Sequence, residues 1–249
     1  MTAVSGIEPR VLLDSASKVN AILADAVLGS PAQSGVTRVL EAGCGQAWVL
    51  TPRSDAVHIT GVDTDGEALR IRREVKGDLD EEILGDLRTV ELPAESFDVI
   101  YCSYVLEHVA GAEAVLDRFL ASLRPGGRLI VRMPDGTSVY GFLVRHSPHR
   151  LHVLYKRYVE RKPDAGKPGH APYPTVYDDV VTLRGLRNWA DRHELEVQHE
   201  FGTNMYLRMF GRLRPVVDAA LRAVAKLSRG QLSASHNNNI CLIIRKPQV

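Results

Sequence analysis

The residues best suited to chemistry lie in a short glycine turn and at the ends of nearby apolar runs. Glu41-Ala42-Gly43-Cys44-Gly45 follows one such run, and its two glycines lack the Cβ atoms that would keep a ligand away from the backbone. Asp63 ends the next run about 20 residues later, where a carboxylate can accept hydrogen bonds from both hydroxyls of a ribose. Together these residues predict a site for a ligand that contains a nucleoside.

Two further polar residues extend this candidate site. Asp86, within Gly85-Asp86-Leu87, can accept a hydrogen bond from an exocyclic amine. His108 follows a third apolar run, and a histidine can act as a general base near neutral pH. The structural alternatives stay open, because the glycines can simply make a sharp turn and His108 can cap the turn after the strand.

The elements that must position these residues alternate between strands and helices. Near-continuous apolar strands separated by helices are typical of a parallel α/β sheet with helices on both faces. The expected strands cover residues 37–42, 57–62, 97–103, 128–133, 195–201 and 240–244, and the expected helices cover 11–28, 65–75, 112–123, 182–193 and 207–227, the last interrupted near Pro215.

Five motifs in order resemble those of the class I S-adenosylmethionine-dependent methyltransferases of the bacterial small-molecule type. They lie within roughly residues 36–134, and five motifs are far more specific than one glycine turn. The resemblance implies a doubly wound, mostly parallel, seven-stranded Rossmann-like sheet with an antiparallel last strand and an inserted cap. The motifs are Val39-Leu40-Glu41-Ala42-Gly43-Cys44-Gly45, Gly61-Val62-Asp63, Gly85-Asp86-Leu87, Phe97-Asp98-Val99-Ile100 with Val105-Leu106-Glu107-His108-Val109, and Leu123-Arg124-Pro125-Gly126-Gly127-Arg128-Leu129.

The resemblance also implies S-adenosyl-L-methionine as the cofactor. Because its sulfonium is a cation, its pocket should avoid lysine and arginine, and residues 39–50 and 97–109 contain neither. One departure is Ala47, where most family members have glycine, and Pro52 leaves room for only a short helix after the turn. The implied cofactor-binding residues are Glu41, Gly43, Cys44, Gly45, Asp63, Thr64, Asp86, Leu87, Ser103 and His108.

The methyl acceptor is expected beneath a cap formed by residues 135–180, which are rich in histidine, tyrosine and proline. The spacing of His146, His149 and His152 is compatible with a metal, but Pro148 interrupts it and no acid lies nearby, so no metal is expected. The alternative is that these side chains only pack the cap onto the sheet. The candidate catalytic residues are His108, His149 and His170, and the candidate substrate-binding residues are Tyr104, His146, His149, Tyr155, Tyr173 and Tyr177.

The 249 residues are expected to form one domain. Its parts are an N-terminal helical segment (1–35), a cofactor-binding half (36–134), the cap (135–180) and a C-terminal half (181–249). The net charge of +1 argues against a nucleic-acid partner. Residues 141–170 and 205–230 are locally basic, which leaves an anionic or lipid-associated substrate open. The basic helical insertion at 205–230 is interpreted as a second cap, a homodimer surface or a peripheral membrane contact.

These observations favour O-methylation of a small molecule by a cytoplasmic enzyme. The three cysteines are far apart, which fits a reducing compartment. No apolar run of 18 residues and no signal-like N-terminus is present. The alternatives are a lipid-associated or nitrogen acceptor, a cofactor-binding protein without catalysis, and an NAD-dependent oxidoreductase. Trp48 disfavours the last, because it stands where the dinucleotide fingerprint needs glycine or alanine.

Overall fold

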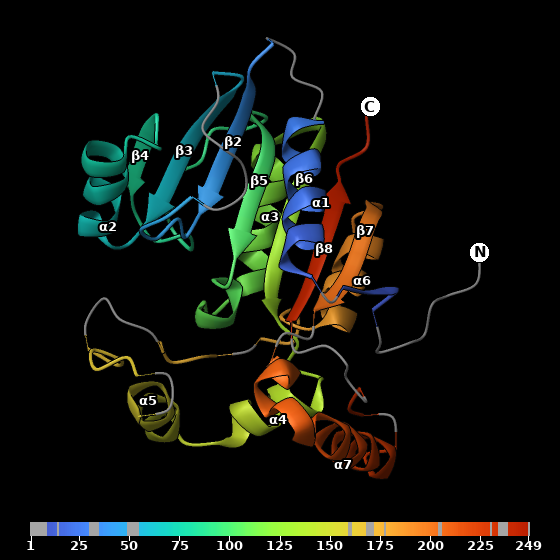
Figure 1. Cartoon of the computed structure of the whole chain (residues 1–249). Helices are drawn as coiled ribbons and strands as arrows, with labels where there is room; N and C mark the ends of the chain where they lie inside the picture. The colour runs from blue at the N-terminus through green and yellow to red at the C-terminus, as the bar shows by residue number, and fades with distance from the viewer. Residues whose placement is uncertain are drawn as a thin grey trace.

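The chain forms a twisted sheet covered by helices on both faces (Figure 1). A computed structural model describes residues 9–13, 15–29, 35–48, 55–158, 161–167, 172–176, 178–203, 206–229, 231–233 and 239–248. Within these ranges the sheet has eight strands in the order β1-β7-β8-β6-β5-β2-β3-β4. Strand β8 is antiparallel to both of its neighbours, and every other pair is parallel. The doubly wound, mostly parallel fold and the antiparallel last strand are therefore confirmed.

The strands carry the apolar runs of the sequence. The first six of the seven residues of β5 are buried, as expected of a central strand covered on both faces. The strand bounds are β1 Val11–Leu13, β2 Thr37–Ala42, β3 Val57–Asp63, β4 Glu81–Leu84, β5 Phe97–Ser103, β6 Leu123–Pro134, β7 Glu196–Thr203 and β8 Asn239–Arg245.

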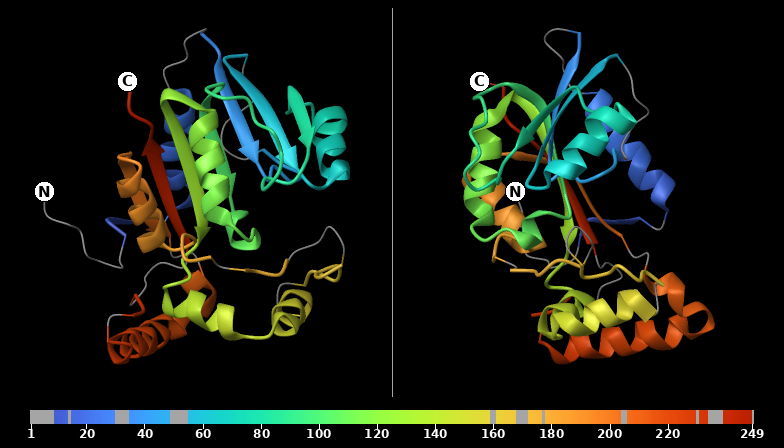
Figure 2. Two further views of the ribbon diagram at one scale, coloured as in Figure 1. Left: turned by 180° about the vertical axis from the view of Figure 1, so that it is seen from behind. Right: turned by 90° about the vertical axis from the view of Figure 1, so that its left-hand side faces the viewer.

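Helices α3 and α6 cover one face of the sheet, and α1 and α2 contribute side chains to the core on the other face (Figure 2). Asp65 is the N-cap residue of helix α2, and its side chain accepts hydrogen bonds from the backbone N–H groups of Glu67 and Ala68. The helix bounds are α1 Ala16–Leu28, α2 Gly66–Arg70, η1 Ile71–Lys76, η2 Leu106–His108, α3 Ala112–Ser122, α4 Val139–His146, α5 His149–Tyr158, α6 Leu183–Arg192, η3 Tyr206–Leu213 and α7 Arg214–Leu227.

Helices α4, α5 and α7 form a separate layer beyond the carboxyl ends of the parallel strands (Figures 1 and 2). We call these three helices the cap layer. Helix α7 packs on α4 through a small apolar cluster of Val139, Leu221 and Ala225. In the described part of the chain, no helix combines the length and the apolarity that crossing a membrane requires.

Several sequence predictions were wrong in detail. The expected seven strands become eight in the described residues. The first part of the expected helix 11–28 is strand β1, which pairs in parallel with β7, so the helix itself starts at Ala16. The edge strand β4 was not predicted, because two of its four residues are glutamates and the other two are too few to give an apolar signal. Pro215 lies in the first turn of α7, where its missing N–H costs nothing, while the kink before it falls at Gly211.

Candidate functional site

A small cavity lies at the carboxyl ends of β2 and β5. Its volume is about 120 Å³. Ligands of open α/β sheets bind at this edge, in a crevice outside the strand ends. The predicted residues Glu41, Gly43, Cys44 and Ser103 line the cavity, together with Ala42, Ala47 and Tyr101.

The glycine turn after β2 forms one wall of this cavity. Gly43 and Gly45 have φ of +67° and +52°, a region that costs other residues energy. A Cβ at Gly43 would lie 2.3 Å from a methyl carbon of Val105, so this position requires glycine for packing as well. No atom lies within 4 Å of a Cβ built on Gly45, so the backbone there is open to a ligand.

Asp63, at the end of β3, is joined to this turn by hydrogen bonds. The N–H of Gly45 donates to one carboxylate oxygen at 2.8 Å, and the N–H of Asp65 donates to the other at 2.9 Å. A carboxylate has about four lone-pair positions, so Asp63 keeps capacity for two hydroxyl donors. Thr64 is exposed beside it. The glycine turn and Asp63 are thus one connected unit.

Beneath the turn, Glu41 forms a buried ion pair with Arg72, a residue of η1. The two groups are 2.8 Å apart, and Arg72 is completely buried. The same guanidinium donates to the carbonyl oxygen of Cys44 at 2.9 Å and to Asp78 at 2.5 Å. Burial raises the pKa of Glu41 to about 7, and the charge of Arg72 opposes that shift. Arg72 therefore fixes the floor of the turn, and it also raises the cost of moving Glu41.

Asp86 and Leu87 lie on the loop after β4. Leu87 is buried in the main core, whereas Asp86 is partly exposed and paired with Arg88. The guanidinium of Arg88 donates to both carboxylate oxygens of Asp86 at 2.5 to 3.0 Å, and these hydrogen bonds lower the pKa of Asp86. An adenine amino group would share this carboxylate with Arg88.

The turn after β5 carries His108. Its Nδ1 lies 2.7 Å from the carbonyl oxygen of Pro174, and a carbonyl can only accept, so Nδ1 bears the proton. The neutral imidazole therefore keeps a lone pair on Nε2. Burial lowers the pKa of His108, which favours this neutral form. Its ring centre is 5.8 Å from that of Tyr173, in an edge-to-face arrangement.

Glu107, beside His108, is a functional candidate that was not among the site residues predicted from the sequence. Its side chain is 3% exposed, and its Oε2 is buried and has no hydrogen-bond partner in the part of the chain that the structure describes. Desolvation raises the pKa of Glu107 to about 7. Its Oε1 lies 3.9 Å from Nε2 of His108. The available sequence signal was a glutamate inside an apolar run. Burying a carboxylate is costly unless it is paired or hydrogen-bonded, so such a residue is a candidate for a functional role.

Residues 172–176 and Asp178 cross this turn, and we call them the strap. The N–H of Val176 donates to the carbonyl oxygen of Glu107 at 2.8 Å. Asp178 accepts the first N–H groups of α3, from Gly111 at 2.6 Å and Ala112 at 2.9 Å. The strap thereby holds Tyr173 next to His108. Burial raises the pKa of Tyr173, and the negative charges of Asp65 and Asp63 raise it further.

The other predicted acceptor-side residues are less closely gathered. Nδ1 of His146 donates to the carbonyl oxygen of Phe142, and the ring of His149 contacts that of His152, so both stay within the cap layer. Tyr155 is 39% exposed on α5. His170, Tyr177 and the expected short helix near Pro52 lie outside the described residues. Over the described ranges, no cluster of three or more potential metal ligands occurs.

Two further aromatic residues, Tyr104 and Trp48, lie near Tyr101, which lines the cavity, through the contacts that follow. Tyr104 has φ of +58° and presents its ring to Arg132, whose guanidinium carbon lies 5.3 Å from the ring centre. Trp48 packs edge-on against Tyr101 at 6.2 Å between ring centres. The sequence did not indicate that Arg72 would bond to Cys44 or Arg132 to Tyr101, because both arginines lie outside the motifs.

Comparison with known proteins decides the family. A family model described as a methyltransferase domain matches residues 15–200, about three quarters of the chain. The chain therefore belongs to the methyltransferase-domain family. This confirms the resemblance to class I S-adenosylmethionine-dependent methyltransferases and S-adenosylmethionine as the cofactor.

Individual relatives agree with this assignment. A ubiquinone biosynthesis O-methyltransferase of Xylella fastidiosa (strain 9a5c) is 32% identical over 173 residues, which is 64% of this chain and 68% of that one. A trans-aconitate 2-methyltransferase of Paracidovorax citrulli is 32% identical over 106 residues, 41% of this chain, and the match spans only 40% of that relative's length. The structure of loganic acid methyltransferase with SAH shares the fold, with a TM-score of 0.56, 9% identity and coverage of 93% and 92%.

Proposed function

We propose that this chain transfers the methyl group of S-adenosylmethionine to an oxygen atom of a small-molecule acceptor. The observation that carries the proposal is a neutral histidine on the turn after β5, whose end lines the cavity, together with an acid that is hydrogen-bonded to the glycine turn on the same cavity. His108 supplies the lone pair, and Asp63 with the glycine turn supplies the donor site. By their names, one relative is an O-methyltransferase and another methylates trans-aconitate, an organic acid. Both names support an oxygen atom of a small molecule as the acceptor.

The residues at the cavity fit the cofactor. Gly45 leaves its backbone open, Asp63 retains acceptor capacity, and the acids Glu41 and Asp86 suit a ligand with a cationic sulfur and an amino group. When bound, S-adenosylmethionine supplies a methyl group on an already activated sulfonium. The protein's main task is then to align the acceptor oxygen with that methyl group and to exclude water.

His108 accepts the proton that a hydroxyl acceptor loses. The oxygen–methyl bond forms as the sulfur–methyl bond breaks, the bonding pair stays on sulfur, and the hydroxyl proton passes to Nε2 of His108. Glu107, 3.9 Å away and with a pKa raised to about 7, stabilises the imidazolium that results. No contact among the described residues brings His149 to this position, and His170 lies outside those residues.

A labelled-methyl assay tests the proposal. The enzyme is incubated with S-adenosylmethionine labelled in the methyl group and with a panel of hydroxy acids, phenols, carboxylic acids and amines. Formation of S-adenosylhomocysteine with a labelled ether or ester is expected, and His108→Gln should slow it. Labelled product from amines alone would contradict the oxygen acceptor, and an absence of turnover together with no S-adenosylhomocysteine binding would reject methyl transfer.

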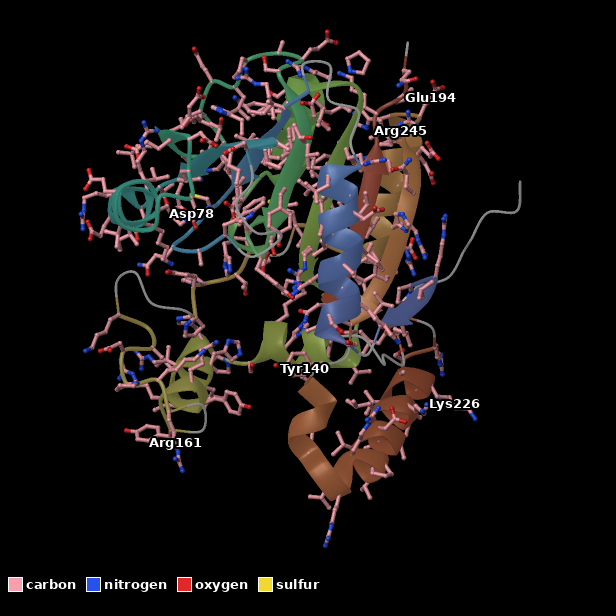
Figure 3. The ribbon with its side chains drawn as sticks, turned by 45° about the horizontal axis from the view of Figure 1, so that its top comes forward. Asp78, Tyr140, Arg161, Glu194, Lys226 and Arg245 are labelled. Atoms are coloured by element: carbon pink, nitrogen blue, oxygen red, sulfur yellow. The ribbon has the colours of Figure 1, made fainter. Side chains whose placement is uncertain are left out.

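A lipid-associated acceptor is the second candidate, favoured by the surface of the cap layer. Leu151, Leu154, Tyr155 and Tyr158 are 39% to 76% exposed at the spacing of one helix face of α5. Arg161 and Lys226 project outward from the cap layer (Figure 3). Exposed apolar side chains beside basic ones suit an anionic membrane surface.

Co-sedimentation with phosphatidylglycerol vesicles tests this second candidate. Leu154→Glu should reduce binding, and Leu84→Glu is the matched control, because Leu84 is 67% exposed on the edge strand β4, away from the cap layer. Equal sedimentation of both variants and the wild type, or no sedimentation of the wild type, would remove this candidate.

A further inference from the structure

Arg132 lies near the end of β6 and contacts Tyr101, a residue that lines the cavity, and no acidic side chain among the described residues pairs with it. It pairs in register with Ser103, so its side chain leaves the same face of the sheet as Tyr101 and Ser103, which line the cavity. Its Nη1 donates to the hydroxyl oxygen of Tyr101 at 3.2 Å. Within the described ranges this is the only hydrogen bond that the guanidinium of Arg132 makes, although the group has five N–H donors.

Other arginines in the sheet region differ from Arg132 in this respect. Arg72 pairs with Glu41 and Asp78 at 2.8 and 2.5 Å. Arg124 reaches Asp98 at 3.0 Å, and Arg187 reaches Glu200 at 2.7 Å. A partly buried cation is costly without a partner, so these pairs are the ordinary solution. Among the described side chains, Arg132 contacts two tyrosines, Tyr101 and Tyr104, and no carboxylate.

The ring of Tyr104 is held against this guanidinium by an unusual backbone conformation. Tyr104 has φ of +58°, which costs a non-glycine residue about 1 kcal/mol or more and tends to occur at functional sites. The guanidinium carbon lies 5.3 Å from the ring centre, within the range of a cation–π contact. The stacked ring limits rotation of the guanidinium and leaves its remaining N–H groups for a ligand.

We propose that Arg132, Tyr101 and Tyr104 form a subsite for a carboxylate of the methyl acceptor. A guanidinium presents two parallel N–H groups that match the two oxygens of a carboxylate. The inference rests on the proposed function and adds the charge of the acceptor to it. A carboxylate held here leaves another oxygen of the same molecule free to face the donor.

The strand order places this subsite on the acceptor side of the cavity. Asp63 is on β3 and Arg132 is on β6, three strands away, which is about 14 Å at the usual strand spacing. The donor's own methionyl carboxylate shares the same chemistry and could come from the other direction. Binding measurements with two donor analogues distinguish these sources, because one analogue lacks that carboxylate.

Titration calorimetry on wild type, Arg132→Gln and Arg132→Lys provides the test. The first arm measures S-adenosylhomocysteine, which has the methionyl carboxylate, and 5′-methylthioadenosine, which lacks it. The second arm uses protein saturated with S-adenosylhomocysteine and titrates citrate, benzoate and hexanoate, with benzamide and hexanamide as uncharged analogues. Arg128→Gln is the matched control, because Arg128 lies on the same strand and donates to Ala26 and Gln198 away from the cavity.

The subsite predicts that wild type binds at least one carboxylate of the panel and binds its amide more weakly. Arg132→Gln should weaken carboxylate binding at least tenfold, Arg132→Lys should restore part of it, and Arg128→Gln should leave it unchanged. Both donor analogues should bind Arg132→Gln within threefold of wild type.

Three results would overturn the inference. Weaker binding of S-adenosylhomocysteine to Arg132→Gln, with unchanged 5′-methylthioadenosine binding, would assign the subsite to the donor. Carboxylate binding that is independent of Arg132, or absent from wild type, would remove the subsite. Failure of wild type to bind S-adenosylhomocysteine would instead contradict the proposed function itself. Circular dichroism melting of each variant establishes that it is folded.

Discussion

Asp63→Asn is the substitution that probes the donor site most specifically. The change preserves the size of the side chain but turns one of its two acceptor oxygens into an amide donor. In the structure each oxygen already accepts a backbone N–H, from Gly45 at 2.8 Å and from Asp65 at 2.9 Å. One of these N–H groups must therefore face the new amide, and the acceptor capacity left for a ribose falls.

The expected loss follows from hydrogen bonds to a charged acceptor, each of which contributes about 1.5–3 kcal/mol. Losing one such bond to the ribose should weaken binding of S-adenosylhomocysteine by roughly 10- to 100-fold, since about 1.4 kcal/mol is a factor of ten. Loosening of the glycine turn should lower the unfolding free energy by about 1–3 kcal/mol. Calorimetric titration and urea unfolding measure the two effects separately.

Asp98→Asn is the matched control for this experiment. Asp98 accepts the N–H of Arg38 at 2.8 Å and a guanidinium N–H of Arg124 at 3.0 Å, at the end of the sheet away from the cavity. It should lose stability and keep wild-type affinity for S-adenosylhomocysteine. If Asp63→Asn binds S-adenosylhomocysteine as tightly as Asp98→Asn does, the reasoning about the donor site is refuted.

Three further predictions concern groups around the cavity. Desolvation raises the pKa of Glu107 from about 4.5 to about 7, so the unfolding free energy should fall as pH rises through that range, by up to about 1.4 kcal/mol per pH unit. Thermal melts should show Glu107→Gln more stable than wild type at pH 8 and equal to it near pH 4.5. Identical melts of the two proteins at both pH values would contradict this. His108→Gln should lower kcat on the order of 100-fold or more and abolish the acid limb of the pH–rate profile, which in wild type lies below the ordinary histidine pKa because burial lowers that of His108; an unchanged acid limb would exclude His108 as the base. Arg72→Met should lower the unfolding free energy by about 3–5 kcal/mol by leaving Glu41 and Asp78 without their cation, and denaturant unfolding should show that adding Glu41→Gln recovers part of the loss; additive losses would contradict the ion-pair account.

The sequence predicted those elements whose pattern is local. The central strand was located at residues 97–103, as observed for β5, because every position of a strand covered on both faces tends to be apolar. The glycine turn and Asp63 follow from the same logic, since they occupy the ends of such strands. The residues around His108 were also recognisable from their order along the chain.

What the sequence did not reveal depends on contacts between distant segments. Arg72 looks like any helical arginine until the fold brings it beneath Cys44, 28 residues away. Only the folded structure shows that Arg132 contacts two tyrosines and no carboxylate among the described side chains. Strand β1 was predicted as helix because three residues carry almost no periodic signal, and its pairing with β7 spans 190 positions.

The most direct test of the account is a crystal structure of the chain with S-adenosylhomocysteine. We predict that the ribose hydroxyls lie within hydrogen-bond distance of Asp63, with the thioether sulfur between the glycine turn and the end of β5. Density for the nucleoside at any other part of the sheet edge, with Asp63 still bonded only to Gly45 and Asp65, would contradict it.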